Sequence, residues 1–273
     1  MSSNLFNFGA FGMAEILTFF AVLVRYSILM SVLPFVGDRT VPGPVKILLA
    51  LAVSLALFPA LVYSGKVKPI EAVIWGKTAS GIISTIGLEA LVGLSLGFTA
   101  KLVFDGVAFG ANLMGNFMGF ASASVYDPHQ ESQTEVIAQI QTTLAMLLFL
   151  ALDGHHMMLR ASLDSYSIVG IGKAAFSAAL AQRVLSFTGE VFHFGLQLAA
   201  PVAVSMFVVN VVFGVISKSM PQINILVLSF SVTALVGLIV MFISNAQFSE
   251  GAAEILLRVS NWIDGVLLAL GGR

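Results

Sequence analysis

One carboxylate lies inside a long apolar stretch of the chain. Glu89 is the single ionisable residue between Thr78 and Ala100. Because a charge in hydrocarbon is costly, such a residue is a functional candidate by default. It would either carry protons or pair with an arginine from another helix, such as Arg25 or Arg160. We favour the pairing, since most residues of this kind have a structural partner.

The residues Asp153, His155 and His156 are of types that bind metal ions. Adjacent histidines leave a helix in different directions, however, and metal pairs on helices prefer spacings of three or four residues. We therefore interpret them as interfacial histidines and predict no metal. The chain also has no cysteine, and no nucleotide-binding or hydrolase motif is present. We expect no enzyme, no catalytic residue and no cofactor.

The sequence pattern of a helix N-terminus occurs shortly before the middle of the chain, at Asp127-Pro128. Asp127 is a favoured N-cap residue and Pro128 suits the first helical position. The carboxylates of Asp127, Glu131 and Glu135 would then surround this helix end. We interpret them as a solvated acidic mouth, with cation or proton binding as the alternative.

Small residues four positions apart occur three times between residues 93 and 119. Such spacings let helix backbones approach closely in a membrane. The pairs are Gly93 with Gly97, Gly106 with Gly110, and Gly115 with Gly119. Tight helix packing is the expected role of the first two pairs.

The last pair lies in an unusual segment, residues 115–124, where glycines alternate with Met and Phe before small polar residues. Glycine leaves helical geometry cheaply, and Met and Phe fill irregular gaps. Non-helical backbone at membrane depth is tolerated inside protein or along a water-filled cavity. The segment therefore fits a re-entrant, pore-occluding loop, and a kinked helix is the alternative.

The amino-acid composition indicates which kind of secondary structure positions these residues. Of 273 residues, 58% are hydrophobic and 10% are charged, against about 25% charged in soluble domains. This predicts an all-α integral membrane protein. The net charge of −1 argues against nucleic acid as a partner, which requires a basic face.

Apolar runs long enough for membrane helices predict six or seven spans. The expected runs cover residues 13–36, 47–65, 78–100, 106–126, 136–152, 191–217 and 219–249. A break is expected at 101–105. The last two long runs are expected to form a helical hairpin, at about 191–246, whose turn contains Pro221. We expect one domain over 1–273, with an N-terminal part at about 13–190, this hairpin, and an amphipathic tail at 247–273.

The order of four segments resembles the FliR family of flagellar export-gate proteins, whose relatives in virulence secretion systems form the SctT family. The segments are Pro34 to Pro42 followed by Lys46, Gly93 to Phe98, Gly115 to Gly119 leading to Asp127-Pro128, and Met220 to Asn224 before 232–238. The resemblance covers about residues 13–257. It implies long helical hairpins assembled in a helical export gate of several subunits.

The resemblance further implies a multi-pass protein of the bacterial inner membrane, in the flagellar basal body. Its partners would be FliP-like, FliQ-like and FlhB-like subunits, membrane lipid, and the unfolded flagellar proteins that the gate exports. It also implies a pore plug, at about residues 110–127. Its residues would be Met114, Gly115, Asn116, Phe117, Met118, Gly119, Phe120, Ala121 and Ser122.

Three alternatives stay open at this point. The equivalent subunit of a virulence injectisome is the nearest to a flagellar export-gate subunit. A small-solute secondary transporter would suit Glu89 and broken helices, although no convincing internal repeat is present. A purely structural scaffold subunit would tolerate disruption of residues 115–122 without a leak.

Overall fold

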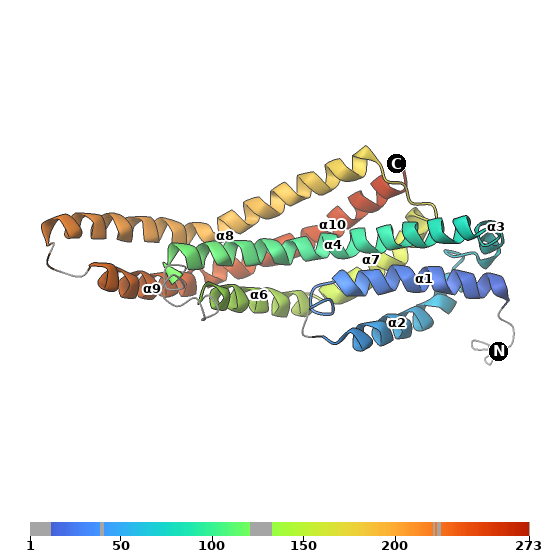
Figure 1. Cartoon of the computed structure of the whole chain (residues 1–273), viewed down its shortest axis with the longest axis horizontal. Helices are drawn as coiled ribbons and strands as arrows, with labels where there is room; N and C mark the ends of the chain where they lie inside the picture. Colours follow the sequence, from blue (N-terminus) through green and yellow to red (C-terminus); the bar gives the residue numbers. More distant parts are fainter. Residues whose placement is uncertain (1–11, 39–40, 121–132, 221, 223–224, 273) are drawn as a thin grey trace. The chain divides into compact units, whose positions relative to one another are not determined.

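The computed structural model describes residues 12–38, 41–120, 133–220, 222 and 225–272. Over these ranges the regular structure is helical, and they contain no β-strand (Figure 1). The prediction of an all-α integral membrane protein is confirmed. The helices, in chain order, are α1 (Met13–Val32), α2 (Gly43–Tyr63), the 3-10 turn η2 (Pro69–Glu71), α3 (Ala72–Trp75), α4 (Ala79–Phe117), α6 (Gln133–Ala151), α7 (Gly154–Ile168), α8 (Ala178–Ser219), α9 (Ile225–Ile243) and α10 (Asn245–Leu270).

Proline chemistry explains the boundary between α1 and α2. Pro34 follows the last turn of α1, where its ring and its missing N–H disfavour a further helical turn, and α2 begins after Pro42 with Pro44 in its first turn. The Lys46 ammonium then donates hydrogen bonds of 2.8 Å to the carbonyl oxygens of both Gly37 and Asp38. The lysine thus fastens the loop onto the helix that follows it.

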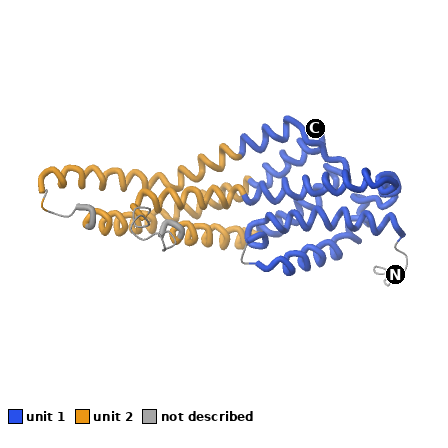
Figure 2. The backbone as a smooth tube through the Cα atoms, viewed as in Figure 1, with its two compact units in different colours: residues 1–101, 154–187, 259–273 blue, residues 102–153, 188–258 orange. Residues whose placement is uncertain are grey.

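The chain forms two compact units, coloured separately in Figure 2. The first comprises residues 1–101, 154–187 and 259–273, and the second comprises 102–153 and 188–258. Each unit therefore combines segments that are far apart in the sequence. The long helices α4, α8 and α10 contribute residues to both units.

In the first unit, α1 packs against α2 and against the short η2 and α3 segments (Figure 1). Fully buried apolar side chains from three helices make its core: Val22, Leu29, Val92, Leu96, Ile263 and Leu267. The end of α10 is also tied to the segment before α8, because the Ala175 amide donates to the Leu270 carbonyl at 2.9 Å. The C-terminal helix is therefore part of this core.

In the second unit, α4 and α8 meet at glycines. A Cβ atom on Gly110 would lie 2.5 Å from the Gly195 carbonyl oxygen, and a Cβ atom on Gly195 would lie 2.7 Å from the Gly106 carbonyl oxygen. Neither position has room for a side chain. The tight packing predicted for the pair Gly106 and Gly110 is confirmed.

The break predicted at residues 101–105 is wrong, because α4 continues through them as one helix of 39 residues. Lys101 and Asp105 are four residues apart, a spacing that a helix accommodates on one face, and nothing between them is a helix breaker. Likewise α8 begins at Ala178, well before residue 191. Charged residues interrupt the hydropathy of these helices without ending them.

Among the described residues, four helices are long and apolar enough to cross a membrane: α1, α2, α4 and α8. Two bent pairs, α6 with α7 at 64° and the later part of α9 with α10 at 55°, raise the number to six if each pair forms one span. The lower end of the predicted six or seven is therefore reached only with broken spans.

Candidate functional site

A buried ion pair lies at the centre of the first unit. The Arg25 guanidinium donates from Nε to Glu89 Oε2 at 2.7 Å and from Nη2 to Glu89 Oε1 at 3.0 Å. The two side chains are 0% and 1% exposed. This two-bonded geometry is the strongest form of the arginine–carboxylate interaction. Of the two arginines expected as partners of Glu89, the structure selects Arg25.

Residues of α7 and of the segment after it complete the surroundings of this pair. Arg25 Nη1 donates to the Ser165 hydroxyl at 2.7 Å, and Nη2 contacts the Val169 carbonyl at 3.3 Å. The Tyr166 ring lies under the guanidinium, 3.8 Å from ring centroid to Cζ, a cation–π contact. The Gly172 amide donates to Glu89 Oε1 at 3.0 Å. Three separate segments are thus joined through one charge pair.

Glycine on α4 makes the approach of the two helices possible. A Cβ atom on Gly93 would lie 2.5 Å from the Arg25 carbonyl oxygen, and one on Gly97 would lie 2.9 Å from Val32 Cβ. The α1 and α4 backbones therefore touch, as the spacing of Gly93 and Gly97 predicts. Glu89 lies one turn before Gly93, so close packing and ion pairing reinforce each other.

The contacts of this cluster indicate a structural role, because they hold separate helices together. Both oxygens of Glu89 accept hydrogen bonds, from Arg25 and from Gly172, so the carboxylate is already engaged. Burial of a charge is tolerated when it is paired and hydrogen-bonded in this way. The geometry favours a structural role for Glu89 over proton transfer.

Sequence reasoning missed Ser165, Tyr166 and Gly172. They lie in the mixed region after residue 153, where hydropathy gives no clear pattern. A serine and a tyrosine side by side on a weakly apolar helix were the available signal, but their partner is 140 residues away in the sequence. Only the folded arrangement identifies them.

The second candidate site is the end of α4, where the pore plug is expected. Met114, Gly115, Asn116 and Phe117 are helical, so a loop over them is wrong, since α4 ends at Phe117. A turn follows, in which the Gly119 amide donates to the Asn116 carbonyl at 3.1 Å. Gly119 has φ +87°, a left-handed conformation that glycine adopts without strain and that commonly ends helices.

This turn is anchored on α9, inside the second unit. Met118 is 0% exposed, and its Sδ lies 2.9 Å from the position that a Cβ atom on Gly237 would occupy. The rings of Phe120 and Phe230 meet edge to face at 6.1 Å. The turn is thereby held by a methionine against a glycine and by one aromatic pair.

The expected plug residues therefore separate into two groups. Met114 and Met118 are buried, whereas Asn116 and Phe117 are exposed, Phe117 to 45%. Ala121, Ser122, Asp127 and Pro128 lie outside the described residues, as do the start of the predicted helix and Glu131. The candidate site thus has an anchored face and an exposed face.

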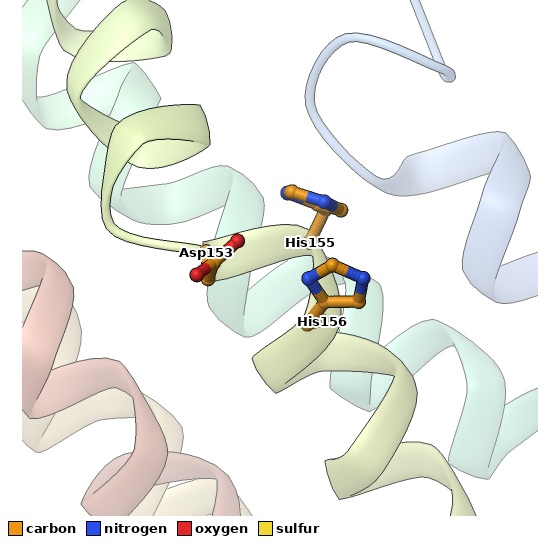
Figure 3. A group of neighbouring side chains, drawn as sticks. All are labelled: Asp153, His155 and His156. Atoms are coloured by element: carbon orange, nitrogen blue, oxygen red, sulfur yellow. The ribbon is translucent and has the colours of Figure 1, made fainter.

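The third group is the one that contains two histidines. Figure 3 shows the imidazoles of His155 and His156 side by side in the first turn of α7, with Asp153 in the preceding turn. One potential ligand atom from each residue lies within 4.8 Å of the others. Asp153 has φ +55°, as suits the sharp turn. The expectation that the two adjacent histidines point in different directions is wrong, because their ring centroids lie 4.2 Å apart. Asp153 and His156 each also interact with another group.

These features define a class of protein: an all-α integral membrane protein whose long helices are closely packed at glycines and fastened by a buried ion pair. The chain belongs to the family described as bacterial export proteins, family 1, whose family model matches residues 16–259. The resemblance seen in the sequence is thereby confirmed.

Individual proteins are similar to the chain over most of their length. The chain is 30% identical over 223 residues to the flagellar biosynthetic protein FliR of Pectobacterium carotovorum subsp. carotovorum, covering 82% of each chain. It is 28% identical to FliR of Escherichia coli strain K12, again over 82% of each chain. It is 26% identical to FliR of Buchnera aphidicola subsp. Baizongia pistaciae, over 94% of this chain and 96% of the relative.

Proposed function

We propose that this chain is a subunit of the flagellar type III protein export gate of the bacterial inner membrane, at the flagellar basal body. It would help to form and seal the channel through which unfolded flagellar subunits leave the cell. The proposal rests on membership of the export-protein family and on relatives named for flagellar biosynthesis. Those names favour the flagellar branch over a virulence injectisome.

The length of the helices is the structural observation that carries the proposal. Helices α4 and α8 have 39 and 42 residues, which is about 58 and 63 Å at 1.5 Å per residue. The hydrocarbon core of a bilayer is about 30 Å thick, and a tilt of 40° lengthens the path only to about 39 Å. Each helix is therefore too long for lipid alone to cover.

The side chains along α8 show why this excess length matters. Many of its apolar residues are exposed, among them Leu185, Phe192, Val204, Phe207, Val211 and Val215. Apolar surface of this extent outside a bilayer marks a protein–protein interface. Subunits of FliP-like, FliQ-like and FlhB-like type, which the family resemblance implies, would supply that cover.

The function requires no covalent chemistry of this chain. A gate passes an unfolded polypeptide by displacement of a seal, for which the exposed Asn116 and Phe117 at the end of α4 are the proposed contacts. A small-solute transporter, in contrast, needs an accessible coupling group, and Glu89 is fully engaged by its partners.

Co-purification tests the proposal. We expect a tagged copy, purified in mild detergent, to bring along a defined complex with FliP-like and FliQ-like chains identified by mass spectrometry. Phe207→Ser, which places a hydroxyl on the exposed face of α8, should reduce their recovery, whereas Glu254→Gln on the exposed polar side of α10 should not. A monodisperse lone protein would overturn the proposal and favour a transporter.

A further inference from the structure

A polar pocket of the first unit shares Tyr166 with the surroundings of the ion pair and is not used by the function proposed above. It has a volume of about 440 Å³ and is formed by residues of α1, of the α2–α3 connection and α3, of the end of α7 and of the segment after it. This volume lies within the range of about 300–1,000 Å³ that is typical of small-molecule sites.

Three lysines and one carboxylate line this pocket, so its lining carries excess positive charge. Lys66 pairs with Asp164 at 2.7 Å and Lys173 pairs with Glu71 at 2.9 Å. The Lys68 side chain is exposed and its ammonium group has no hydrogen bond or ion pair with the described residues, whereas its backbone carbonyl accepts from the Glu71 amide at 3.0 Å. One ammonium group is therefore free to bind an anion.

A tyrosine of α7 also belongs to the lining of the pocket. Tyr166, whose ring lies under Arg25, also lines the pocket and is 2% exposed. Its hydroxyl is buried without a hydrogen-bond partner among the described residues. Because a buried hydroxyl without a partner is costly, a small rearrangement that exposes it to the pocket would let it donate to a ligand oxygen.

The surface beside the pocket is apolar. The short η2 and α3 segments expose Ile70, Val73 and Ile74 to 74%, 47% and 76%, while Trp75 of the same turn lines the pocket. Tryptophan with neighbouring lysines is characteristic of the membrane–water interface. An anion-binding pocket next to an apolar turn matches a ligand with a charged head and hydrocarbon chains.

We propose that this pocket binds the phosphate group of an anionic phospholipid. Lys68 would be its principal cationic contact, and Lys66 and Lys173 would be further cations of the same lining. The acyl chains would lie along Ile70 and Ile74. Basic pockets between membrane helices are known to hold anionic headgroups, and here an unpaired lysine and an unpaired hydroxyl occur in the same pocket.

Tryptophan fluorescence gives a direct test on the full-length chain in uncharged detergent. The chain has two tryptophans, and Trp262 stacks on Phe187 at 5.5 Å, so Trp262→Phe retains an aromatic ring and leaves Trp75 as the single reporter. We expect brominated phosphatidylglycerol to quench Trp75 at lower concentration than brominated phosphatidylcholine. Lys68→Gln should reduce this preference roughly fivefold, as expected for one lysine near an anionic headgroup.

Lys77→Gln is the matched control, because Lys77 is also exposed, lies close in sequence and does not line the pocket. It should leave the preference unchanged. Inorganic phosphate is the competing source: if it displaces the lipid from the parent chain and not from Lys68→Gln, the phosphate subsite is supported. Equal quenching by both lipids, or equal effects of Lys68→Gln and Lys77→Gln, would overturn the proposal.

Discussion

The ion pair of Arg25 and Glu89 should contribute substantially to the stability of the protein. Glu89→Gln removes the charge that compensates the fully buried guanidinium, and breaking a buried pair from one side costs about 3–5 kcal/mol. We expect a lower unfolding temperature in detergent and less assembled complex. Thermal unfolding of the purified chain measures the first effect, and recovery of the complex measures the second.

A second, exposed ion pair in the same unit supplies the control. Glu71→Gln breaks the pair with Lys173, whose side chain is 63% exposed, and such surface pairs contribute at most about 1 kcal/mol. The double variant Arg25→Met with Glu89→Leu should recover part of the loss, because no charge is left buried. If Glu89→Gln assembled normally but abolished export, a role in proton coupling would be favoured instead.

At the scale of single residues, the sequence predicts that Glu89 is important but does not predict all the groups that surround it. A lone carboxylate in an apolar run identifies Glu89, and the scarcity of arginines limits its partners to a few. The contacts of Ser165, Tyr166 and Gly172 depend on how α7 and the segment after it fold back onto α1. No local sequence pattern predicts that these segments fold back onto α1.

At the scale of helices, glycine contacts should decide how α1 and α4 pack. Gly93→Ala places a Cβ atom 2.5 Å from the Arg25 carbonyl oxygen, so the helices must separate, at a cost of about 1–3 kcal/mol. Gly87→Ala on the same helix meets nothing within 4 Å and should be neutral or stabilising by up to about 1 kcal/mol, since alanine favours helix. Thermal unfolding compares the two, and equal effects would contradict close packing at Gly93.

The continuity of α4 through residues 101–105 gives another prediction. The native chain has no cysteine, so single-cysteine variants report accessibility without background. Lys101→Cys and Asp105→Cys should react with a polar maleimide, whereas Val103→Cys and Phe104→Cys should be protected, because these two positions are buried and the other two exposed. Labelling at all four positions would contradict a continuous α4 and support the break that hydropathy predicts at residues 101–105.

Hydropathy predicts the positions of most helices but not where the long ones end. Pro34 and Pro42 mark the turn after α1 because proline physically limits a helix. Lys101 and Asp105 have no such effect, and charge alone is compatible with a helix that is covered by protein. The α4 glycines, in contrast, are readable from their spacing, since close backbone approach requires small residues at those positions.

At the scale of the whole molecule, the proposed assembly accounts both for apolar helices that are longer than a bilayer is thick and for the need to seal a channel. Helices that are too long for a bilayer need protein neighbours, and a channel among such neighbours needs a closure. We propose the end of α4 as this closure, because Met118 packs on Gly237 and anchors the turn while Phe117 is left exposed. The glycine-rich composition predicts a deformable segment here, but only the fold separates the anchoring side chains from the exposed ones.

Because Phe117 is exposed and Met118 is buried, substitution of the first should change ion conductance and substitution of the second should change stability. Phe117→Ala should raise the ion conductance of the assembled complex while leaving the unfolding temperature unchanged, because it removes an exposed ring from the proposed seal. Met118→Ala should lower stability by about 2–4 kcal/mol, since it opens a cavity beside Gly237. Conductance in planar bilayers and thermal unfolding measure the pair. If Phe117→Ala stayed as tight as the parent while Met118→Ala leaked without losing stability, the buried face would be the seal and the proposed division of the plug residues would be reversed.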